Sequence, residues 1–231
     1  MPHPSNEDYD ELSWIVEPDS LSAWKTLKAK IGVAWYRMTR GARWLQSAIS
    51  RGQYNHPEGI FFGGTTETWS NQTLQKIVER HLSQASRVVL VDVHTGLGEY
   101  GAIEGITEID PGSPRYQWML RCSSIPITNP HAGDAVSPPV NGPLNRGFER
   151  LLSNAEVIAV SLEFGTYRPS KVLWALRAEN YLHHQDDHEP LDASEIKAEL
   201  KRMFYPQNDD WERAVWQKGS EMVLETLDCL R

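Results

Sequence analysis

Cysteine is nearly absent from this sequence, which contains only Cys122 and Cys229. The two residues are far apart in the chain and lack the short spacing that is typical of metal-binding cysteines, and a single pair does not suggest a disulfide framework. Because unpaired thiols are typical of reducing compartments, we expect a cytoplasmic protein.

Long apolar runs and an excess of positive charge are also lacking. No stretch approaches the roughly 20 apolar residues of a membrane-spanning helix, and the first residues, MPHPSNEDYDEL, are too polar and acidic for a signal peptide. The chain has 23 lysine and arginine residues against 31 aspartate and glutamate residues, which gives a formal net charge of −8. We therefore expect a soluble protein whose partners include neither nucleic acid nor membranes.

Tryptophan, in contrast, is abundant, with nine residues in a chain of 231. Near the N-terminus, apolar side chains recur every three or four residues, at Trp24, Leu27, Ile31, Trp35 and Met38. This spacing predicts a helix over residues 21–49, with a bend at Gly41, whose apolar face enters the core. We interpret most tryptophans as core anchors, and an aromatic platform for sugars is the alternative.

The remaining pattern predicts an α/β fold in a single domain over residues 1–231, in which residues 1–20 form a polar loop. Two apolar runs, at residues 88–93 and 157–164, are strong strand candidates, and residues 117–122 are a weaker one. Parallel sheets usually have more strands, and helices must cover both of their faces. The sequence therefore indicates the C-terminal portion of a mainly parallel sheet flanked by helices.

Each strong strand candidate ends in a residue that can take part in catalysis. The first ends with His94 in VDVHTG, and the second ends with Glu163 in SLEFGT. Ligands of open α/β sheets bind beyond the carboxyl ends of the strands, so two adjacent parallel strands would place both groups in one crevice. A neutral imidazole can bind zinc, and a carboxylate can activate a zinc-bound water as general base. The alternatives are a hydrogen-bonded structural histidine and a glutamate that forms a salt bridge.

Several segments together resemble a known family over nearly the whole chain, from about residue 7 to the C-terminus. They are GQYNHPEGIFFGGT (52–65), TWSNQTL (68–74), VDVHTGLGEYG (91–101), LEFGTY (162–167), VLWALRAENYLHH (172–184) and IKAELKRMFYP (196–206). These segments are similar to the zinc-carboxypeptidase-like family of uncharacterised bacterial and fungal proteins, in the M14 metallocarboxypeptidase clan.

The resemblance implies a zinc-dependent hydrolase of peptide or amide bonds, with a peptide-like or amide small molecule as substrate. At matching positions, His94 corresponds to a zinc ligand and Glu163 to the general base. The clan's other two zinc ligands come from an upstream His-x-x-Glu motif, and an Asn-Arg pair after it holds the substrate carboxylate. No His-x-x-Glu occurs in this sequence. We therefore expect an N-terminally truncated domain with impaired zinc binding and activity.

Other residues are weaker candidates for a function. Asn145 and Arg146 repeat the Asn-Arg pair, but they follow Pro143 at an expected helix start. His184 and His188 have the spacing of two metal ligands on a helix. Because Pro190 follows them, we interpret the segment as a solvated helix end that leads into a loop. Asp92 shares a strand face with His94 and could orient it.

Two functions therefore stay open. The first is the zinc-dependent hydrolase, and the second is a non-catalytic remnant or binding protein that keeps the fold without tight metal binding. An incomplete sheet would expose an apolar face, so we also expect self-association.

Overall fold

The computed structural model describes residues 5–185 and 190–230. They divide into two compact units. Unit 1 comprises residues 1–65, 138–141 and 168–204, and unit 2 comprises residues 66–137, 142–167 and 205–231. The expectation that the chain forms a single domain stays a prediction.

The described part of unit 1 consists of helices and loops, with an isolated β-bridge between Gln53 and Phe62. Its helices are α1 (Glu7–Val16), α2 (Ala23–Thr39), α3 (Ala42–Ser50), α7 (Pro169–His183) and α8 (Pro190–Phe204). α7 begins with Pro169, whose fixed φ and missing N–H suit the first turn of a helix. Arg177 on α7 is buried and donates from Nε to the carbonyl oxygen of Ile15 at 2.7 Å, which ties α7 to α1.

The expectation of a polar loop over residues 1–20 is wrong, because α1 occupies half of that segment. Four of its side chains are fully buried, and they are Tyr9, Leu12, Ile15 and Val16. They recur at helical spacing among acidic residues, and the acidic residues of the first turn suit the positive end of the helix dipole. The polar composition of the segment hid a narrow apolar stripe that forms the core of unit 1.

The expected helix over residues 21–49 is two helices, because Gly41 has φ +91° and separates α2 from α3. The prediction for its buried face is also wrong. Trp24, Leu27, Ile31, Trp35 and Met38 are all exposed, and of the whole of α2 only Ala29 is fully buried. Trp14, Trp69 and Trp216 are exposed too, so most tryptophans are not core anchors.

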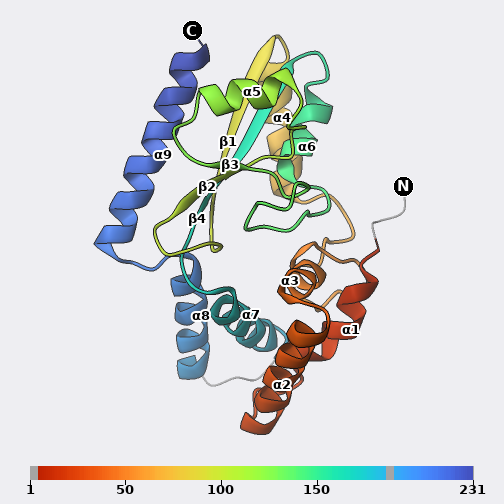
Figure 1. Ribbon diagram of the computed structural model, residues 1–231. Helices are drawn as coiled ribbons and strands as arrows, with labels where there is room; N and C mark the ends of the chain where they lie inside the picture. The colour runs from red at the N-terminus through yellow and green to blue at the C-terminus, as the bar shows by residue number, and fades with distance from the viewer. Residues whose placement is uncertain (1–4, 186–189, 231) are drawn as a thin grey trace. The chain divides into compact units, whose positions relative to one another are not determined.

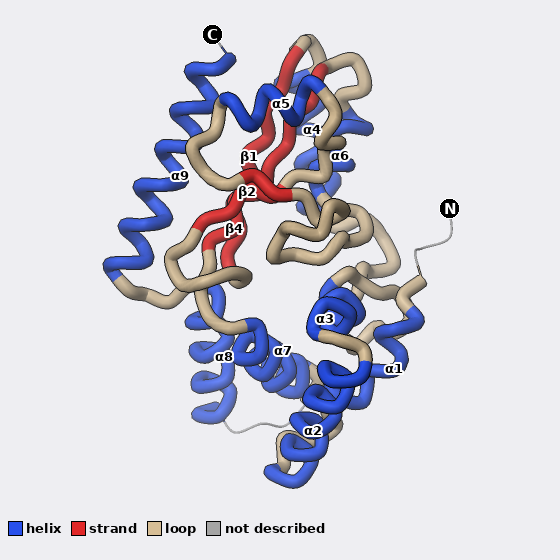
Figure 2. Tube along the Cα trace, in the orientation of Figure 1, coloured by secondary structure: helices blue, strands red, loops and turns tan. Residues whose placement is uncertain are grey.

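Unit 2 contains the sheet, whose strands are β1 (Arg87–Thr95), β2 (Ile103–Ile106), β3 (Ile127–Thr128) and β4 (Glu156–Phe164). The order is β1-β4-β2-β3, with β1 parallel to β4, β3 parallel to β2, and β2 antiparallel to β4. Figure 2 shows the strands in red. This confirms the expected α/β class with a mainly parallel sheet flanked by helices. Both strong strand candidates are confirmed as β1 and β4.

Helices cover both faces of this sheet (Figure 1). On one face, side chains of β4 such as Ile158 and Leu162 pack with Trp211 and Met222 of α9 (Asp209–Leu230) and with Met119 of α5 (Pro114–Arg121). On the other face, Val88 and Val157 pack with side chains of α4 (Trp69–Leu82) and α6 (Leu144–Leu151). Odd and even positions of β1 and β4 therefore serve different layers.

Residues 117–122, the weaker strand candidate, are not a strand. Ser113 accepts a hydrogen bond from the N–H of Tyr116 and caps α5, and Pro114 is the first residue of this helix. A serine followed by proline is a typical helix start, and this local signal outweighs the β-forming side chains that follow.

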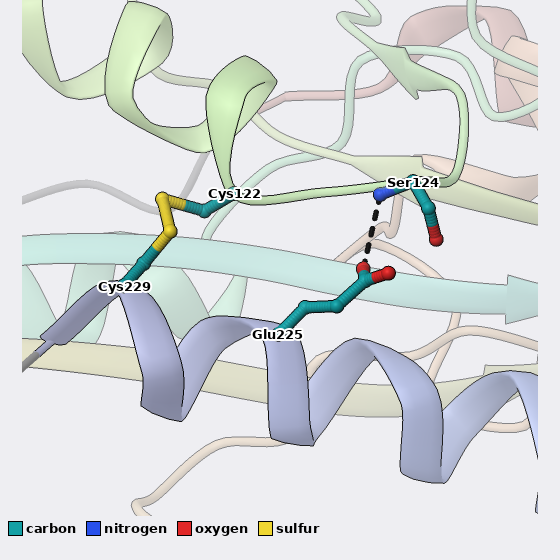
Figure 3. The surroundings of a disulfide bond; sticks show 4 residues. All are labelled: Cys122, Ser124, Glu225 and Cys229. Atoms are coloured by element: carbon teal, nitrogen blue, oxygen red, sulfur yellow. Dashed lines mark hydrogen bonds between the residues drawn. A yellow bond between two sulfur atoms is a disulfide. The ribbon is translucent and has the colours of Figure 1, made fainter.

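Cys122 and Cys229 form a disulfide, contrary to the expectation of unpaired thiols. Figure 3 shows that the bond joins the residue after α5 to the last turn of α9, next to a hydrogen bond from the Ser124 N–H to Glu225 at 3.0 Å. The cysteines are 107 residues apart in sequence, so only the fold brings them together. Disulfides persist in oxidising compartments, so this bond removes the argument for a cytoplasmic location.

Among the helices of the described residues, none combines the length and the apolar character needed to cross a membrane.

Candidate functional site

The carboxyl ends of β1 and β4 carry a row of polar side chains on one face of the sheet. His94 is directly opposite Glu163 in the β1–β4 register, and Asp92 is opposite Ser161 two pairs earlier, on the same face. On the other side of β4, Glu104 of β2 is directly opposite Glu163. Directly opposite residues project to the same face, so three neighbouring strands place His94, Glu163 and Glu104 side by side.

The two halves of this sheet face differ sharply in polarity. Toward the amino ends of β1 and β4, Val88 and Val157 are buried under α4 and α6. Farther along the same face, toward the carboxyl ends, β1 carries Asp92 and His94, and β4 carries Glu163. The polar row therefore begins where the apolar cover of this face ends.

The glycine-rich turn after β1 closes over the end of β4. Gly96 donates its N–H to the Phe164 carbonyl at 3.2 Å, and Gly101 donates its N–H to the Gly165 carbonyl at 3.0 Å. Between them, the Leu97 N–H donates to Oε1 of Glu163 at 2.9 Å. Gly96 has φ +134° and Gly98 has φ +100°, conformations that glycine adopts readily. The turn thus bends sharply enough to place an amide donor on the candidate base.

Gly165, in the EFGT segment, is required by close approach of this turn. A Cβ atom at Gly165 would overlap the backbone carbonyl of Glu99. Gly98, which belongs to the same turn as Glu99, also lies close to the Cα atom of Gly165. The two glycine-containing segments of the sequence, HTGLG and EFGT, therefore interlock, and they cover the Glu163 carboxyl group.

Glu163 is the buried acid of the site, with only 6% of its surface exposed. Burial raises the pKa of its carboxyl group from 4.5 to about 7, because the charged form loses its hydration. The hydrogen bond from Leu97 and the nearby His94 lower the pKa, and the carboxylate of Glu104 raises it. A carboxyl group whose pKa lies near neutral pH can both accept and return a proton under physiological conditions.

His94 lies between two carboxylates. Its Nε2 is 2.8 Å from Oδ2 of Asp92, and its Nδ1 is 4.0 Å from Oε2 of Glu163. An imidazole that donates Nε2–H to Asp92 keeps a lone pair on Nδ1, on the side of Glu163. Thus Asp92 orients His94, and the two candidate site residues meet on one face of the sheet. About half of the His94 side chain is exposed, so solvent reaches this gap.

Zinc does not fit the donor set of the described residues. A zinc site needs about three protein ligands. Among residues 5–185 and 190–230, no three His, Cys, Asp or Glu side chains are grouped so that they could hold a metal ion. The imidazole of His94 is one donor of the right chemistry, and its neighbour Asp92 is engaged in orienting it. We therefore derive no step through zinc.

The repeated Asn-Arg pair lies elsewhere in unit 2. Arg146 forms ion pairs with Glu108 and Glu149, each at 3.1 Å, and it lines a pocket of about 450 Å³. His94 and Glu163 do not line this pocket. Because both partners of Arg146 are carboxylates of the chain itself, its charge is already compensated.

The remaining weaker candidates do not join the site. His184 directly follows α7 and contacts the ring of His183 edge to face, while His188 lies outside the described residues.

Glu104 is the member of the site that the sequence did not suggest. It lies on β2, a strand of four residues that was not among the strand candidates of the sequence. Thr128 Oγ1 donates to its carboxylate at 2.5 Å, and the Val136 N–H donates to it at 3.3 Å. The sequence of β2 is IEGI, and two isoleucines around a glutamate and a glycine are too short a pattern to distinguish a strand from a turn.

One family model matches residues 1–218, and its description is "Protein of unknown function (DUF2817)". The chain belongs to the DUF2817 family. No curated protein and no solved structure shows significant similarity to this chain. The DUF2817 match covers the HTGLG and EFGT segments, so the interlocked turn and strand end lie within the region that defines the family.

Proposed function

We propose that this DUF2817 protein hydrolyses peptide or amide bonds of small molecules and that Glu163 is its general base. The observation that supports this most is the buried Glu163 carboxyl group, whose pKa of about 7 suits proton transfer at neutral pH. The resemblance to the M14 clan assigns the same role to this position and supplies the substrate class.

The site geometry supports a simple sequence of proton transfers. A water molecule within hydrogen-bond reach of His94 Nδ1 also reaches Glu163 Oε2, because these two atoms are 4.0 Å apart. Ionised Glu163 accepts a proton from this water as the water attacks the amide carbonyl carbon. The resulting carboxylic acid then returns the proton to the leaving amine. Asp92 keeps the His94 ring in the orientation that this arrangement needs.

A second function has specific support, because the described residues lack a group of three metal ligands. A non-catalytic protein that retains the fold would keep the hydrogen bonds of Glu163 and His94 without turnover. Zinc, which the family resemblance implies, would then be bound weakly or not at all.

The test is a panel of N-acyl amino acids and dipeptides incubated with the purified full chain, with and without added zinc. We expect release of free amine that is lost in Glu163→Gln and in His94→Ala. Glu156→Gln is the matched control, because it removes a carboxylate at the other end of β4. Absence of Glu163-dependent turnover from the panel, together with zinc-free, folded protein, would favour the non-catalytic function.

A further inference from the structure

Two helices in different units each expose an apolar stripe with the same spacing. On α2 the stripe is Trp24, Ile31, Trp35 and Met38, and on α9 it is Trp216, Val223, Leu227 and Leu230. In both helices the positions are i, i+7, i+11 and i+14, which lie on one line along a helix. Leu27 adds to the first stripe and Leu224 to the second. We call these the α2 stripe and the α9 stripe.

The α2 stripe lies opposite the side of α2 that packs in unit 1. Ala29 is buried there, and Val33 and Tyr36 pack against the same core. A Cβ atom at Gly32 would meet the ring of Trp14, so this side of the helix is in close contact with α1. The five apolar side chains of the α2 stripe, in contrast, are between roughly half and four-fifths exposed.

The α9 stripe is held outward by contacts on the other side of that helix. Trp211, Met222 and Thr226 are buried, and Trp211 donates Nε1–H to the Gly165 carbonyl at 2.9 Å. Figure 3 shows that Cys229 and Glu225 point toward Cys122 and Ser124, which fixes the last turns of α9. Leu227 lies between these two residues in sequence, and half of its surface is exposed.

The charges of the two helices are opposite. α2 contains four basic residues, Lys25, Lys28, Lys30 and Arg37, and no acidic residue, and one of the four, Lys25, forms an ion pair with Asp19 before the helix. α9 contains six acidic residues, Asp209, Asp210, Glu212, Glu221, Glu225 and Asp228, and two basic ones, Arg213 and Lys218. The positive charge of α2 is unusual in a chain with a net charge of −8. Contact between one α2 and one α9 would therefore be electrostatically favourable, whereas pairing of α2 with α2 or of α9 with α9 would not.

We propose that the α2 stripe of one copy of this chain docks on the α9 stripe of a second copy. Aligned rows of Trp, Ile, Val, Leu and Met side chains can interdigitate as in other helix pairs, and the opposite net charges of α2 and α9 favour this pairing over pairing of two like helices. Because the contact joins two different surfaces, it can link many copies in a row. Two copies form a closed dimer only if each places its α2 stripe on the α9 stripe of the other.

The association should be weak. Five partly exposed large side chains offer on the order of 500 Å² of apolar surface per stripe. Stable complexes bury about 800 Å² per partner, so we expect a dissociation constant in the range of roughly 1–100 µM. Ionic strength should weaken it, because salt screens the opposite charges of the two helices.

The test is sedimentation equilibrium of the full chain as a function of protein and salt concentration. We expect the average mass to rise with protein concentration at low salt. Ile31→Gln/Trp35→Gln on the α2 stripe and Val223→Gln/Leu227→Gln on the α9 stripe should each weaken association about tenfold or more. Ile77→Gln/Leu120→Gln is the matched control, because it changes two exposed apolar residues on α4 and α5 and should leave association unchanged.

Mixing the two stripe variants distinguishes this contact from symmetric ones. The α2-stripe variant keeps its α9 stripe and the α9-stripe variant keeps its α2 stripe, so an equimolar mixture should form heterodimers that neither variant forms alone. Far-ultraviolet circular dichroism and thermal unfolding verify that each variant folds as the parent chain does.

Three outcomes would overturn the proposal. One is a chain that stays monomeric at about 1 mM and low salt, far above the expected dissociation constant. Another is association that only one of the two stripe variants disturbs, which indicates a symmetric contact. The third is binding to phosphatidylserine vesicles that the α2-stripe variant loses while sedimentation shows monomers, since the basic α2 would then be a lipid contact.

Discussion

The backbone N–H of Leu97 donates a hydrogen bond to Oε1 of Glu163 at 2.9 Å, across 66 residues of sequence. This bond joins the two segments that the sequence singled out, HTGLG and EFGT. It also gives the buried carboxyl group one fixed donor while its other oxygen faces His94. The glycine-rich turn thus packs over the candidate base, whose burial raises the pKa of its carboxyl group to about 7.

The buried carboxyl group of Glu163 should make the folded protein less stable as the pH rises. The folded pKa of about 7 exceeds the ordinary value of 4.5, so the folded state binds this proton more tightly than the unfolded state does. The loss in the free energy of unfolding that results from ionising Glu163 is absent below pH 4.5, grows between pH 4.5 and 7, and is complete above pH 7. It amounts to at most on the order of 3 kcal/mol.

Glu163→Gln, which keeps an oxygen for the Leu97 N–H, should therefore be more stable than the parent at pH 8. At pH 4 the two proteins should have similar stability. Urea unfolding at both pH values measures the difference. An equal effect at pH 4 and pH 8 would show that the ionisation of Glu163 is not responsible.

Glu104→Gln should lower the pKa of Glu163. The two residues are opposite each other on β2 and β4, and the negative charge of Glu104 disfavours a second negative charge on Glu163. Glutamine keeps an acceptor for Thr128 and for the Val136 N–H, so the local fold should remain. Carbon-13 NMR of the glutamate carboxyl groups follows the titration, and Glu156→Gln at the far end of β4 is the control. A Glu163 titration that both variants leave unchanged would remove Glu104 from the site.

The parts of the fold that the sequence predicted correctly are those with strong local signals. β1 and β4 contain continuous apolar runs, and in each strand the last residue but one is the site candidate that the sequence indicated. Their pairing could be anticipated because parallel strands align their carboxyl ends. The sequence therefore sufficed to place His94 and Glu163 together. Glu104 could be assigned to the site only from the order of the strands in the structure.

The parts that failed are those where periodicity alone had to decide which face is buried. A helical repeat shows that a stripe exists, but it does not show whether core or solvent lies beside it. In α2 the larger stripe, from Trp24 to Met38, is exposed, and small side chains around Ala29 and Gly32 allow the close packing instead. In α1 the buried stripe is hidden among acidic residues. The disulfide was missed because nothing local relates Cys122 to Cys229.

Loss of the disulfide should destabilise the chain by about 4–5 kcal/mol, because it closes a loop of 107 residues in the unfolded state. Cys122→Ser/Cys229→Ser, or the parent in the presence of a reductant, should unfold at a lower urea concentration. The stability of the double variant should not respond to reductant, which makes it the control for side effects of the reagent. Free thiol titration of the unreduced parent should find no reactive cysteine. Two reactive thiols per chain would contradict the pairing.

Gly165→Ala should destabilise unit 2 and expose Glu163. The added Cβ overlaps the Glu99 carbonyl, so the turn over residues 96–101 must move away from the end of β4. We expect a loss of about 2–4 kcal/mol in the free energy of unfolding. If the turn moves, water can hydrate the carboxyl group of Glu163, so the pKa of this group should fall from about 7 toward 4.5.

Gly147→Ala on α6 is the matched control for this substitution. No atom lies within 4 Å of a Cβ placed there, and alanine is the better helix former, so stability should rise by about 0.5–1 kcal/mol. Urea unfolding gives both free energies, and carbon-13 NMR gives the Glu163 titration. If Gly165→Ala lowered stability but left the pKa of Glu163 near 7, then burial by the glycine-rich turn would not be what raises that pKa, and the cover that links HTGLG to EFGT would have only a structural role.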